Sequence, residues 1–594
     1  MIDDNYSFGP FRIDRTSMKL QRDGVDLPLR KKAVEVLVAL AEYAGETVSY
    51  EELGVRVWGE DYIEYNTIKA TVSAARKVLG DEYKGFIESL PTIGYRFHHP
   101  ERGDELLPRR RSKPQKVLLT TFKDPTGDPG KAYLAPSITF ELGKALSRID
   151  GINVIKATAD TMQFLSEQQR SEIRYMVTGS VAGTEERPTV WVELLALPEA
   201  RVVWNDSYRT TFSRLQTLPA EIAAKIARVV QRKIDFEEMI KTSDEKVDRQ
   251  AYKLYLRGLY HWNRPTEVDL FHAINCFHEA TARDATYATA FGAMAHAYGL
   301  MALAGFLPPD SAMPQARDAA VKCLQLLPRS PEGLAGLAAV EGYYLWNWQD
   351  SEKLLKRSIA ANPEYETAHH LYAMGCLLPQ TRLKEALREI HRAEEINPLS
   401  PFIITCTGIL HYYSRDNDHA LEHFDRALEL QPHYHLAHWH RGWTLAELKR
   451  HDEAIFAVST ALAASNNSPQ VLAALGYVFA LADRDAEARR ILVQLKKISR
   501  EHYVSPYDLA LIHAALQNDL KTLSLLKSAV DQRSTMLARL TVHPVFDRFR
   551  SDSKFKALLQ AIHLLPGNGS PDVDKPLMPT WRKPRKAVKG RSRN

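Results

Sequence analysis

The chain has 594 residues, of which 45% are hydrophobic and 25% charged, and its formal net charge at pH 7 is +5. This is the composition of an ordinary soluble protein with about three or four domains, so it excludes a chain too polar to bury a core. The four cysteines lie at least 30 residues apart and form no CxxC pair, which excludes a disulfide scaffold and indicates a reduced, cytoplasmic protein.

The first 29 residues predict a small antiparallel sheet. Their apolar residues form short, partly alternating runs that are broken at Asp23-Gly24. Alternation over a few residues is typical of strands with one buried face. The runs contain Phe8, Phe11, Ile13, Met18, Leu20, Val25, Leu27 and Leu29.

Three helices are predicted next. Apolar residues at helical spacing follow the basic start 30–32 and stop before Gly45, and Ser49 with Glu52 forms a capping box for a second helix that includes Trp58. A third helix is predicted from about 66 to 79. Its inward stripe consists of Ile68, Val72, Ala75 and Leu79.

The opposite side of the third helix is small and polar. It carries Asn66, Ala70, Ser73, Ala74 and Lys77, with Lys69 and Arg76 along one flank. A helix furnished in this way can enter the major groove of DNA. Residues 87–97 then predict two short strands around Pro91-Thr92-Ile93-Gly94, which is a hairpin or wing.

Residues 1–100 resemble the OmpR/PhoB-type winged-helix DNA-binding family through these strands, the helices around VWGEDY and TIKATVSAARKVLG, and the closing GYRF. The resemblance implies a third helix in the major groove of promoter DNA and a wing at the minor groove. The DNA-binding residues that it implies here are Asn66, Lys69, Ala70, Ser73, Arg76, Lys77, Thr92 and Arg96.

This sequence departs from the family pattern in its charges. The family usually has several arginines on the third helix and one in the wing, whereas Ser73, Ala74 and Pro91-Thr92 stand here. Residues 1–100 hold 13 basic and 16 acidic side chains, so attraction to DNA must come from local cations. Few phosphate contacts per copy predict a homodimer or cooperative binding. The alternative is a winged helix used for protein contact.

No membrane attachment and no phosphorylation control are expected. Met1 to Asn5 are acidic and polar, unlike a signal peptide, and the polar linker 101–116 cannot span a bilayer as the corresponding segment does in relatives of ToxR/CadC type. The charge-free stretch 285–309 is interpreted as a buried helix pair. No receiver domain is expected before the winged helix, and activation by aspartyl phosphate is therefore not expected.

Residues 117–236 predict a central small α/β domain with a three- or four-stranded sheet of mixed direction. The stretch FKDPTGDPGKAYLAPSITFELGKAL resembles TolB-like amino-terminal domains of bacterial regulators and cyclase-associated proteins. The loop Gly127–Lys131 lacks the spacing and the Ser/Thr of a phosphate-binding loop, so it is interpreted as a turn. The domain is expected to regulate or to bind a partner.

Residues 247–535 repeat with a period of 34 and are identified as tetratricopeptide repeats. The recurring small residues are Ala386, Ala420, Ala454 and Ala488; Ala393, Ala427 and Ala461; and Gly408, Gly442 and Gly476. About eight helix pairs in a right-handed superhelix are expected. Residues 536–566 are predicted to form a terminal capping helix, and 567–594 a basic disordered tail that either attracts nucleic acid or is simply solvated.

The concave face of such an array is expected to bind a protein or peptide. In this family it is lined by first-helix positions, of which Phe402, Tyr412, Trp439, Trp443 and Tyr477 are aromatic here. The alternative is that Trp439 and Trp443 pack between repeats. A histidine cluster nearby does not have a metal-ligand pattern, and no metal or cofactor is predicted. Its members are His433, His435, His438 and His440, with His419 and His423 one turn apart.

The fold expected is multidomain: an N-terminal winged helix-turn-helix (α+β), a central small α/β domain and a C-terminal all-α tetratricopeptide solenoid. No motif pairs a nucleophile with a base, so no enzymatic activity is predicted. The combination resembles soluble HilA-like activators and implies a one-component transcription regulator whose repeats sense or recruit a partner. The alternative is a cytosolic scaffold of the cyclase-associated type, which DNA binding would distinguish.

Overall fold

The computed structural model describes residues 6–14, 17–41, 47–58, 65–90, 94–98, 115–149, 151–157, 161–165, 167–230, 247–264 and 266–564. The chain divides into two compact units, residues 1–113 and 114–594. Of the predicted linker 101–116, residues 101–114 lie outside the described residues, as does the predicted tail 567–594, while 115 and 116 belong to the first strand of the next domain. Within the described ranges, no helix is long and apolar enough to cross a bilayer.

The first unit is a winged helix with two small sheets. Strands β1 (Tyr6–Phe8), β2 (Phe11–Asp14), β3 (Lys19–Arg22) and β4 (Val25–Asp26) form an antiparallel meander, as predicted. Helices α1 (Lys31–Ala41) and α3 (Tyr65–Leu79) were also predicted, whereas the second helix is split into α2 (Tyr50–Leu53) and a π-helical turn, Gly54–Trp58. The predicted apolar runs meet in one core that includes Phe8, Leu37 and Phe97.

The wing is a three-stranded sheet in the order β5-β7-β6. Strands β6 (Ile87–Leu90) and β7 (Gly94–Phe97) form the predicted hairpin, with Ile87 opposite Phe97 and Leu90 opposite Gly94. Strand β5 (Thr47–Ser49) pairs with β7 and was not predicted, because three residues are too few to show alternation.

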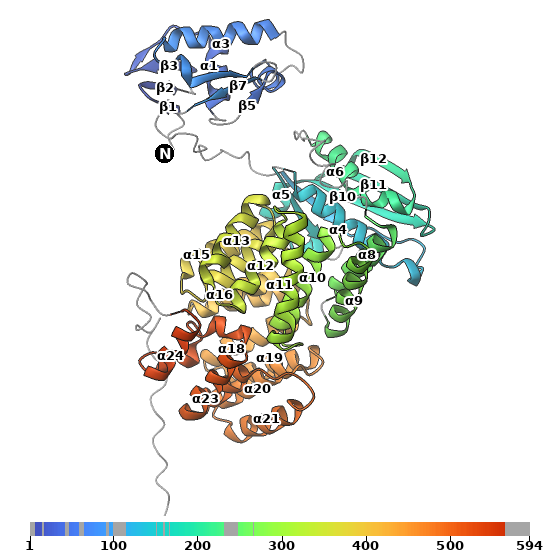
Figure 1. The fold of residues 1–594 in the computed structure, drawn as a ribbon, viewed down its shortest axis with the longest axis vertical. Helices are drawn as coiled ribbons and strands as arrows, with labels where there is room; N and C mark the ends of the chain where they lie inside the picture. Colours follow the sequence, from blue (N-terminus) through green and yellow to red (C-terminus); the bar gives the residue numbers. More distant parts are fainter. Residues whose placement is uncertain are drawn as a thin grey trace, which may run out of the picture. The chain divides into compact units, whose positions relative to one another are not determined.

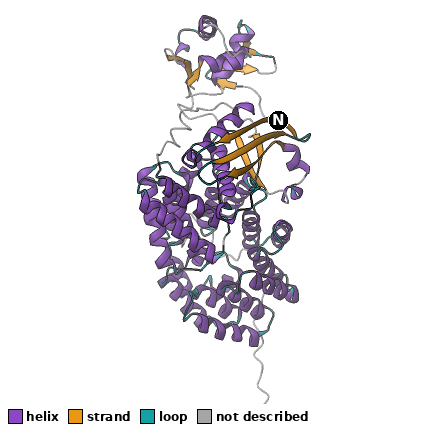
Figure 2. Cartoon of the chain, turned by 90° about the vertical axis from the view of Figure 1, so that its right-hand side faces the viewer, coloured by secondary structure: helices purple, strands orange, loops and turns teal. Residues whose placement is uncertain are grey.

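The second unit begins with a five-stranded sheet in the order β12-β11-β10-β8-β9 (Figure 2). The prediction of three or four strands was too low, and the mixed direction was correct: β9 and β10 run parallel to β8, β11 runs antiparallel to β10, and β12 runs antiparallel to β11. The strands are β8 (Gln115–Thr120), β9 (Ile152–Ala157), β10 (Ile173–Gly183), β11 (Pro188–Ala196) and β12 (Arg201–Arg209).

Helices α4 (Leu134–Ser147) and α6 (Leu218–Val229) share a core with this sheet, and the short α5 (Glu167–Glu172) precedes β10. That core continues without a break into the first repeats, where Ser137 Oγ donates to the carbonyl of Leu256 at 2.8 Å. An ion pair joins Lys144 to Glu332 at 2.9 Å. The sheet and the repeats therefore form one body.

Eight helix pairs follow, as the 34-residue period predicts (Figure 1). They are α8 (Arg249–Trp262) and α9 (Glu267–Arg283); α10 (Ala288–Leu303) and α11 (Pro309–Leu326); α12 (Pro331–Tyr343) and α13 (Trp348–Ala361); α14 (Glu366–Leu371), continued by the π-helical Tyr372–Leu377, and α15 (Leu383–Ile396); α16 (Pro401–Tyr413) and α17 (Asn417–Leu430); α18 (His435–Glu447) and α19 (His451–Ala464); α20 (Pro469–Leu481) and α21 (Asp485–Ile498); α22 (Pro506–Ala515) and α23 (Asp519–Asp531).

The recurring glycines permit close packing within each pair. A Cβ atom at Gly408 would lie 2.6 Å from Cε1 of Phe424, and one at Gly442 would lie 2.4 Å from Cγ2 of Val458. Both distances are far below van der Waals contact, so only glycine fits where the first helix crosses the second.

Three short elements end the described chain: the 3-10 turns η7 (Thr535–Arg539) and η8 (Pro544–Phe549), and helix α24 (Ser553–Ala561). They lie beside the inner helices of the repeats, including α16, α18 and α22. In Figure 1 these elements are drawn at the red end of the coloured ribbon, where α24 is labelled.

Candidate functional site

Helix α3 presents the polar face that its sequence predicts. Ile68, Val72, Ala75 and Leu79 are buried against the core of the winged helix. Their opposite face is open, and five of the predicted DNA-contacting residues are exposed there: Asn66, Lys69, Ala70, Ser73 and Lys77. These side chains are short except for the two lysines, so the helix backbone can approach a surface closely.

Arg76 lies on the predicted flank of α3, but its side chain contacts the wing. It is half-buried, and its guanidinium donates to the carbonyl of Ile87, through Nε at 3.1 Å, and to Ser89 Oγ at 2.9 Å. The same group lies 5.6 Å from the ring centre of Tyr95. All three partners belong to the wing hairpin, so Arg76 holds the hairpin against α3 in this structure.

Of the two wing residues predicted to contact DNA, the structure describes Arg96 but not Thr92. Arg96 is half-buried on β7, and its Nη1 lies 3.5 Å from Oε2 of Glu88 on β6. His98 Nε2 lies 3.1 Å from the same carboxylate oxygen. Thr92 lies outside the described residues.

The glycine-rich loop 124–131 in the second unit is tied into turns. The Asp124 carboxylate accepts from the amide and hydroxyl of Thr126, and Asp128 accepts from the amide of Gly130 at 2.9 Å. Amides that bind carboxylates of their own loop are not available to a phosphate, and the carboxylates would repel it. This geometry supports the interpretation as a turn.

The predicted aromatic groove exists, but it is not open. Tyr412, Trp439, Trp443 and Tyr477 are all buried, whereas Phe402 is 38% exposed. Trp443 lies edge-on to Trp439 and to Tyr477, with ring centres 5.4 and 5.3 Å apart. The prediction that these four side chains line a vacant partner groove was therefore wrong.

The chain itself fills this groove. The ring of His543 lies 5.1 Å from that of Trp443, 5.5 Å from that of Tyr477 and 6.3 Å from that of Tyr412. Phe546, three residues farther along the same segment, packs on Tyr507 of α22. We call residues 534–564 the groove segment. It was predicted as a capping helix, yet it covers inner side chains from several repeats.

Polar contacts fix the groove segment along its length. Asp547 forms an ion pair with Arg415 at 3.1 Å, and Arg415 also donates to the carbonyl of Val542 at 2.9 Å. Farther along, Trp348 Nε1 donates to the carbonyl of Ile562 at 2.9 Å. Burial, together with the charges of Arg415 and Arg539, lowers the pKa of His543 well below its usual value, so this imidazole is neutral.

The histidines at 433–440 do not converge. His440 is buried with Nδ1 bonded to the carbonyl of Leu436 at 3.0 Å, and His438 Nε2 bonds to the carbonyl of Pro432 at 2.8 Å. His423 instead faces His391 and His411, two residues that the sequence analysis did not select. These three histidines lie on three different helices, so no spacing along one helix relates them. Their proximity follows only from the packing of neighbouring repeats.

Comparison with known proteins identifies two parts of the chain. Residues 24–97 match the family described as transcriptional regulatory protein, C terminal, and residues 407–469 match the tetratricopeptide repeat family. The first match covers strand β4, the helices α1, α2 and α3, and the wing strands β5, β6 and β7. The second covers part of α16 together with α17, α18 and α19.

Three curated relatives that the chain resembles are named as regulators of transcription. The transcriptional regulator HilA of Salmonella typhimurium is 24% identical over 412 residues, which span 66% of this chain and 71% of the relative. The transcriptional regulatory protein AfsQ1 of Streptomyces coelicolor is 30% identical over 101 residues, 16% of this chain and 45% of the relative. The transcriptional activator CadC of Escherichia coli is 26% identical over 108 residues, 17% of this chain and 21% of the relative.

Proposed function

We propose that this chain, a DNA-binding transcriptional regulator with an OmpR/PhoB-type winged helix and tetratricopeptide repeats, acts in the cytoplasm as a one-component regulator of promoters. The observation that carries the proposal is the uncovered face of α3, where Asn66, Lys69, Ala70, Ser73 and Lys77 are exposed on one side of a helix whose other side is core. An enzymatic role is not part of the proposal.

In this proposal α3 lies in the major groove of the duplex. Ser73 and Ala70 allow close approach to base edges, while Lys69 and Lys77 reach phosphates. The wing, with Thr92 and Arg96, follows the adjacent minor groove. Arg76 acts as a positioning residue, because its hydrogen bonds to the hairpin fix the angle between wing and helix.

So few cations supply little counterion release, and one copy alone should bind weakly. We therefore propose that two copies occupy half-sites about one helical turn apart, or 10–10.5 base pairs. The formal charge of residues 1–100, with 13 basic and 16 acidic side chains, supports this dependence on a second copy.

The repeats are proposed to bind a protein or peptide that changes the activity of the regulator. Since the groove segment covers Tyr412, Trp443 and Tyr477, and Trp439 is buried beside Trp443, that partner would contact the remaining surface of the array, which includes the exposed Phe402. The ring of Phe402, at the start of α16, lies 4.8 Å from that of His370 on α14, so it is held in place for such a contact.

The test is chromatin mapping of the full-length protein beside the double variant Lys69→Ala/Lys77→Ala. Arg76 is retained, so that the wing keeps its support. The matched control is Lys496→Ala/Lys497→Ala, which removes two exposed lysines from α21. We expect discrete bound sites for the parent and the control, and their loss in the double variant.

Sites that persist in the double variant would contradict the assignment of α3. No sites for the parent under several growth conditions would favour the alternative, a scaffold that uses its winged helix for protein contact.

A further inference from the structure

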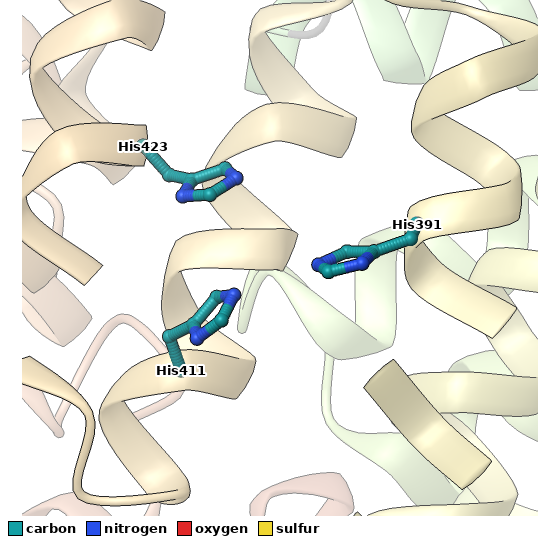
Figure 3. Close-up of side chains that lie close together, drawn as sticks. All are labelled: His391, His411 and His423. Atoms are coloured by element: carbon teal, nitrogen blue, oxygen red, sulfur yellow. The ribbon is translucent and has the colours of Figure 1, made fainter. Parts of the chain in front are cut away.

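Three imidazoles from three consecutive helices meet on the repeat array. His391 lies on α15, His411 on α16 and His423 on α17, and one ring nitrogen of each lies within 4.8 Å of the other two (Figure 3). The ring centres are 5.2 Å apart for His411 and His423, and 5.7 Å apart for His391 and His411. Side chains that belong to two neighbouring repeats therefore converge on one point.

Hydrogen bonds orient two of these rings. His411 Nδ1 lies 3.0 Å from Oδ2 of Asp416, and His423 Nδ1 lies 2.8 Å from the carbonyl oxygen of His419. Both partners are oxygens that only accept, so Nδ1 carries the hydrogen in each ring. A neutral imidazole with its hydrogen on Nδ1 has its lone pair on Nε2, and this is the arrangement that fixes histidine ligands in metalloproteins.

The charges around the three rings favour a cation. Asp416 accepts from His411 and also from His419, whose Nδ1 is 2.9 Å from the carboxylate. The carboxylate of Glu394 lies 3.7 Å from Nε2 of His423, and Arg426 neutralises it in part through an ion pair. His391 is exposed, so an ion can reach the cluster from solvent.

We propose that His391, His411 and His423 bind a divalent transition-metal ion, with Zn²⁺ as the best match in a reducing cytoplasm. Imidazole nitrogen is a ligand for zinc, copper and nickel rather than for magnesium or calcium. A Zn–N bond of about 2.0–2.1 Å brings tetrahedral nitrogens to roughly 3.3 Å from one another, so the rings must close on the ion. His391 is exposed, so its side chain can move toward the ion without disturbing the buried core.

A fourth position is left for water or for Glu394. The bound ion would join the pair α14/α15 to the pair α16/α17. The proposal is independent of DNA binding, because no residue of the winged helix takes part.

A second set of side chains shares His411: Asp416 and His419 also lie within reach of it. In that set the nitrogens nearest the carboxylate already donate to it, so both rings would have to give up these bonds to ligate a metal. The set with His391 needs no such loss, and it is the one proposed.

The experiment uses tag-free full-length protein treated with a chelator. Co²⁺ is titrated first and followed by its visible absorption, and Zn²⁺ is then added to displace it, with calorimetry to give the affinity. We expect one ion per chain, a visible spectrum typical of low coordination number, and a rise in the melting temperature with Zn²⁺.

Four variants decide between the sets. His391→Ala and His423→Ala should each weaken binding at least about 100-fold, whereas His419→Ala and the control His433→Ala, at an exposed histidine outside the cluster, should bind as the parent does. His391→Ala removes an exposed side chain, so its melting temperature without metal should equal that of the parent. Unchanged binding in His391→Ala, loss of binding in His419→Ala, or no binding by the parent would each overturn the proposal.

Discussion

The face of α3 and the concave face of the repeats were both predicted as binding faces, yet the structure leaves one open and closes the other. Helical spacing placed the selected side chains together on α3, and the resemblance to tetratricopeptide repeats placed the others on the concave face. On α3 that face carries Asn66, Ser73 and Lys77, all exposed, whereas in the repeats the corresponding face carries Trp443 and Tyr477, both buried. Periodicity identifies a face, but it does not reveal whether a distant segment covers it.

The chemistry of the two faces explains the difference. Large aromatic side chains bury about 150–250 Å² each, so a groove lined by several of them gains much free energy when it is covered. The groove segment supplies aromatic rings of its own, His543 and Phe546. Small and charged side chains gain little from burial, and the face of α3 stays available for an external ligand.

Among the substitutions proposed here, Phe546→Ala should destabilise the covered face of the repeats the most. Phe546 is 0% exposed and packs on Tyr507, Phe549 and Phe555, so its truncation leaves a cavity and should lower the free energy of unfolding by about 3–5 kcal/mol. Urea unfolding followed by intrinsic fluorescence measures the change.

Phe456→Ala is the matched control, since Phe456 on α19 is 74% exposed. It should change the free energy of unfolding by no more than about 0.5 kcal/mol. Equal unfolding midpoints for the two variants would mean that the groove segment is not part of the core.

Lowering the pH should also destabilise the packing of the groove segment on the repeats. Because the pKa of His543 is lowered in the folded chain, the unfolded chain alone takes up this proton once the pH falls below about 6.5. The free energy of unfolding should then fall by up to about 1.4 kcal/mol per pH unit for this group. Above pH 7 the imidazole is neutral in both states and makes no contribution.

His543→Asn isolates that contribution. An amide oxygen can replace Nδ1 as the acceptor for the amide of Val545. We expect the unfolding free energy of the variant to depend less on pH than that of the parent between about pH 6.5 and 4.5. Parallel pH profiles would show that His543 does not resist protonation in the folded chain.

How much the sequence could predict depended on whether the interactions were local. The stripe of Ile68 and Leu79, the wing around Gly94 and the repeat glycines all follow from spacing within one element or one period, and these parts of the fold were predicted correctly. The ion pair between Arg415 and Asp547 joins residues 132 positions apart, and no period relates them. The position of the groove segment therefore required the structure.

Arg76 shows the same limit at closer range. It falls on the flank of α3 that the sequence assigns to DNA, and only the register of the hairpin brings the carbonyl of Ile87 and the hydroxyl of Ser89 to its guanidinium. Burial of a side chain by a neighbouring strand is a tertiary effect that a helical projection cannot include.

Arg76→Ala should thus lower the stability of the winged helix. The substitution removes a half-buried charged donor that bonds two groups of the wing. It should lower the free energy of unfolding of this unit by about 1–2 kcal/mol, as measured by thermal or urea unfolding. DNA binding should weaken as well, because the wing loses its support. If the variant is as stable as the parent, the wing contacts of Arg76 do not stabilise the fold, and a direct contact of Arg76 with DNA is favoured instead.

Lys77→Ala should have the smallest effect on stability and a clear one on DNA. Lys77 is exposed next to Arg76 on α3, so its removal should change the free energy of unfolding by no more than about 0.5 kcal/mol. If it contacts one phosphate, the slope of log affinity against log salt should decrease in magnitude by about 0.9 per copy bound. Mobility-shift titrations of the parent and the variant at several salt concentrations measure this slope. An unchanged slope would mean that the open face of α3 does not approach phosphate at Lys77, because counterion release does not depend on the base sequence bound.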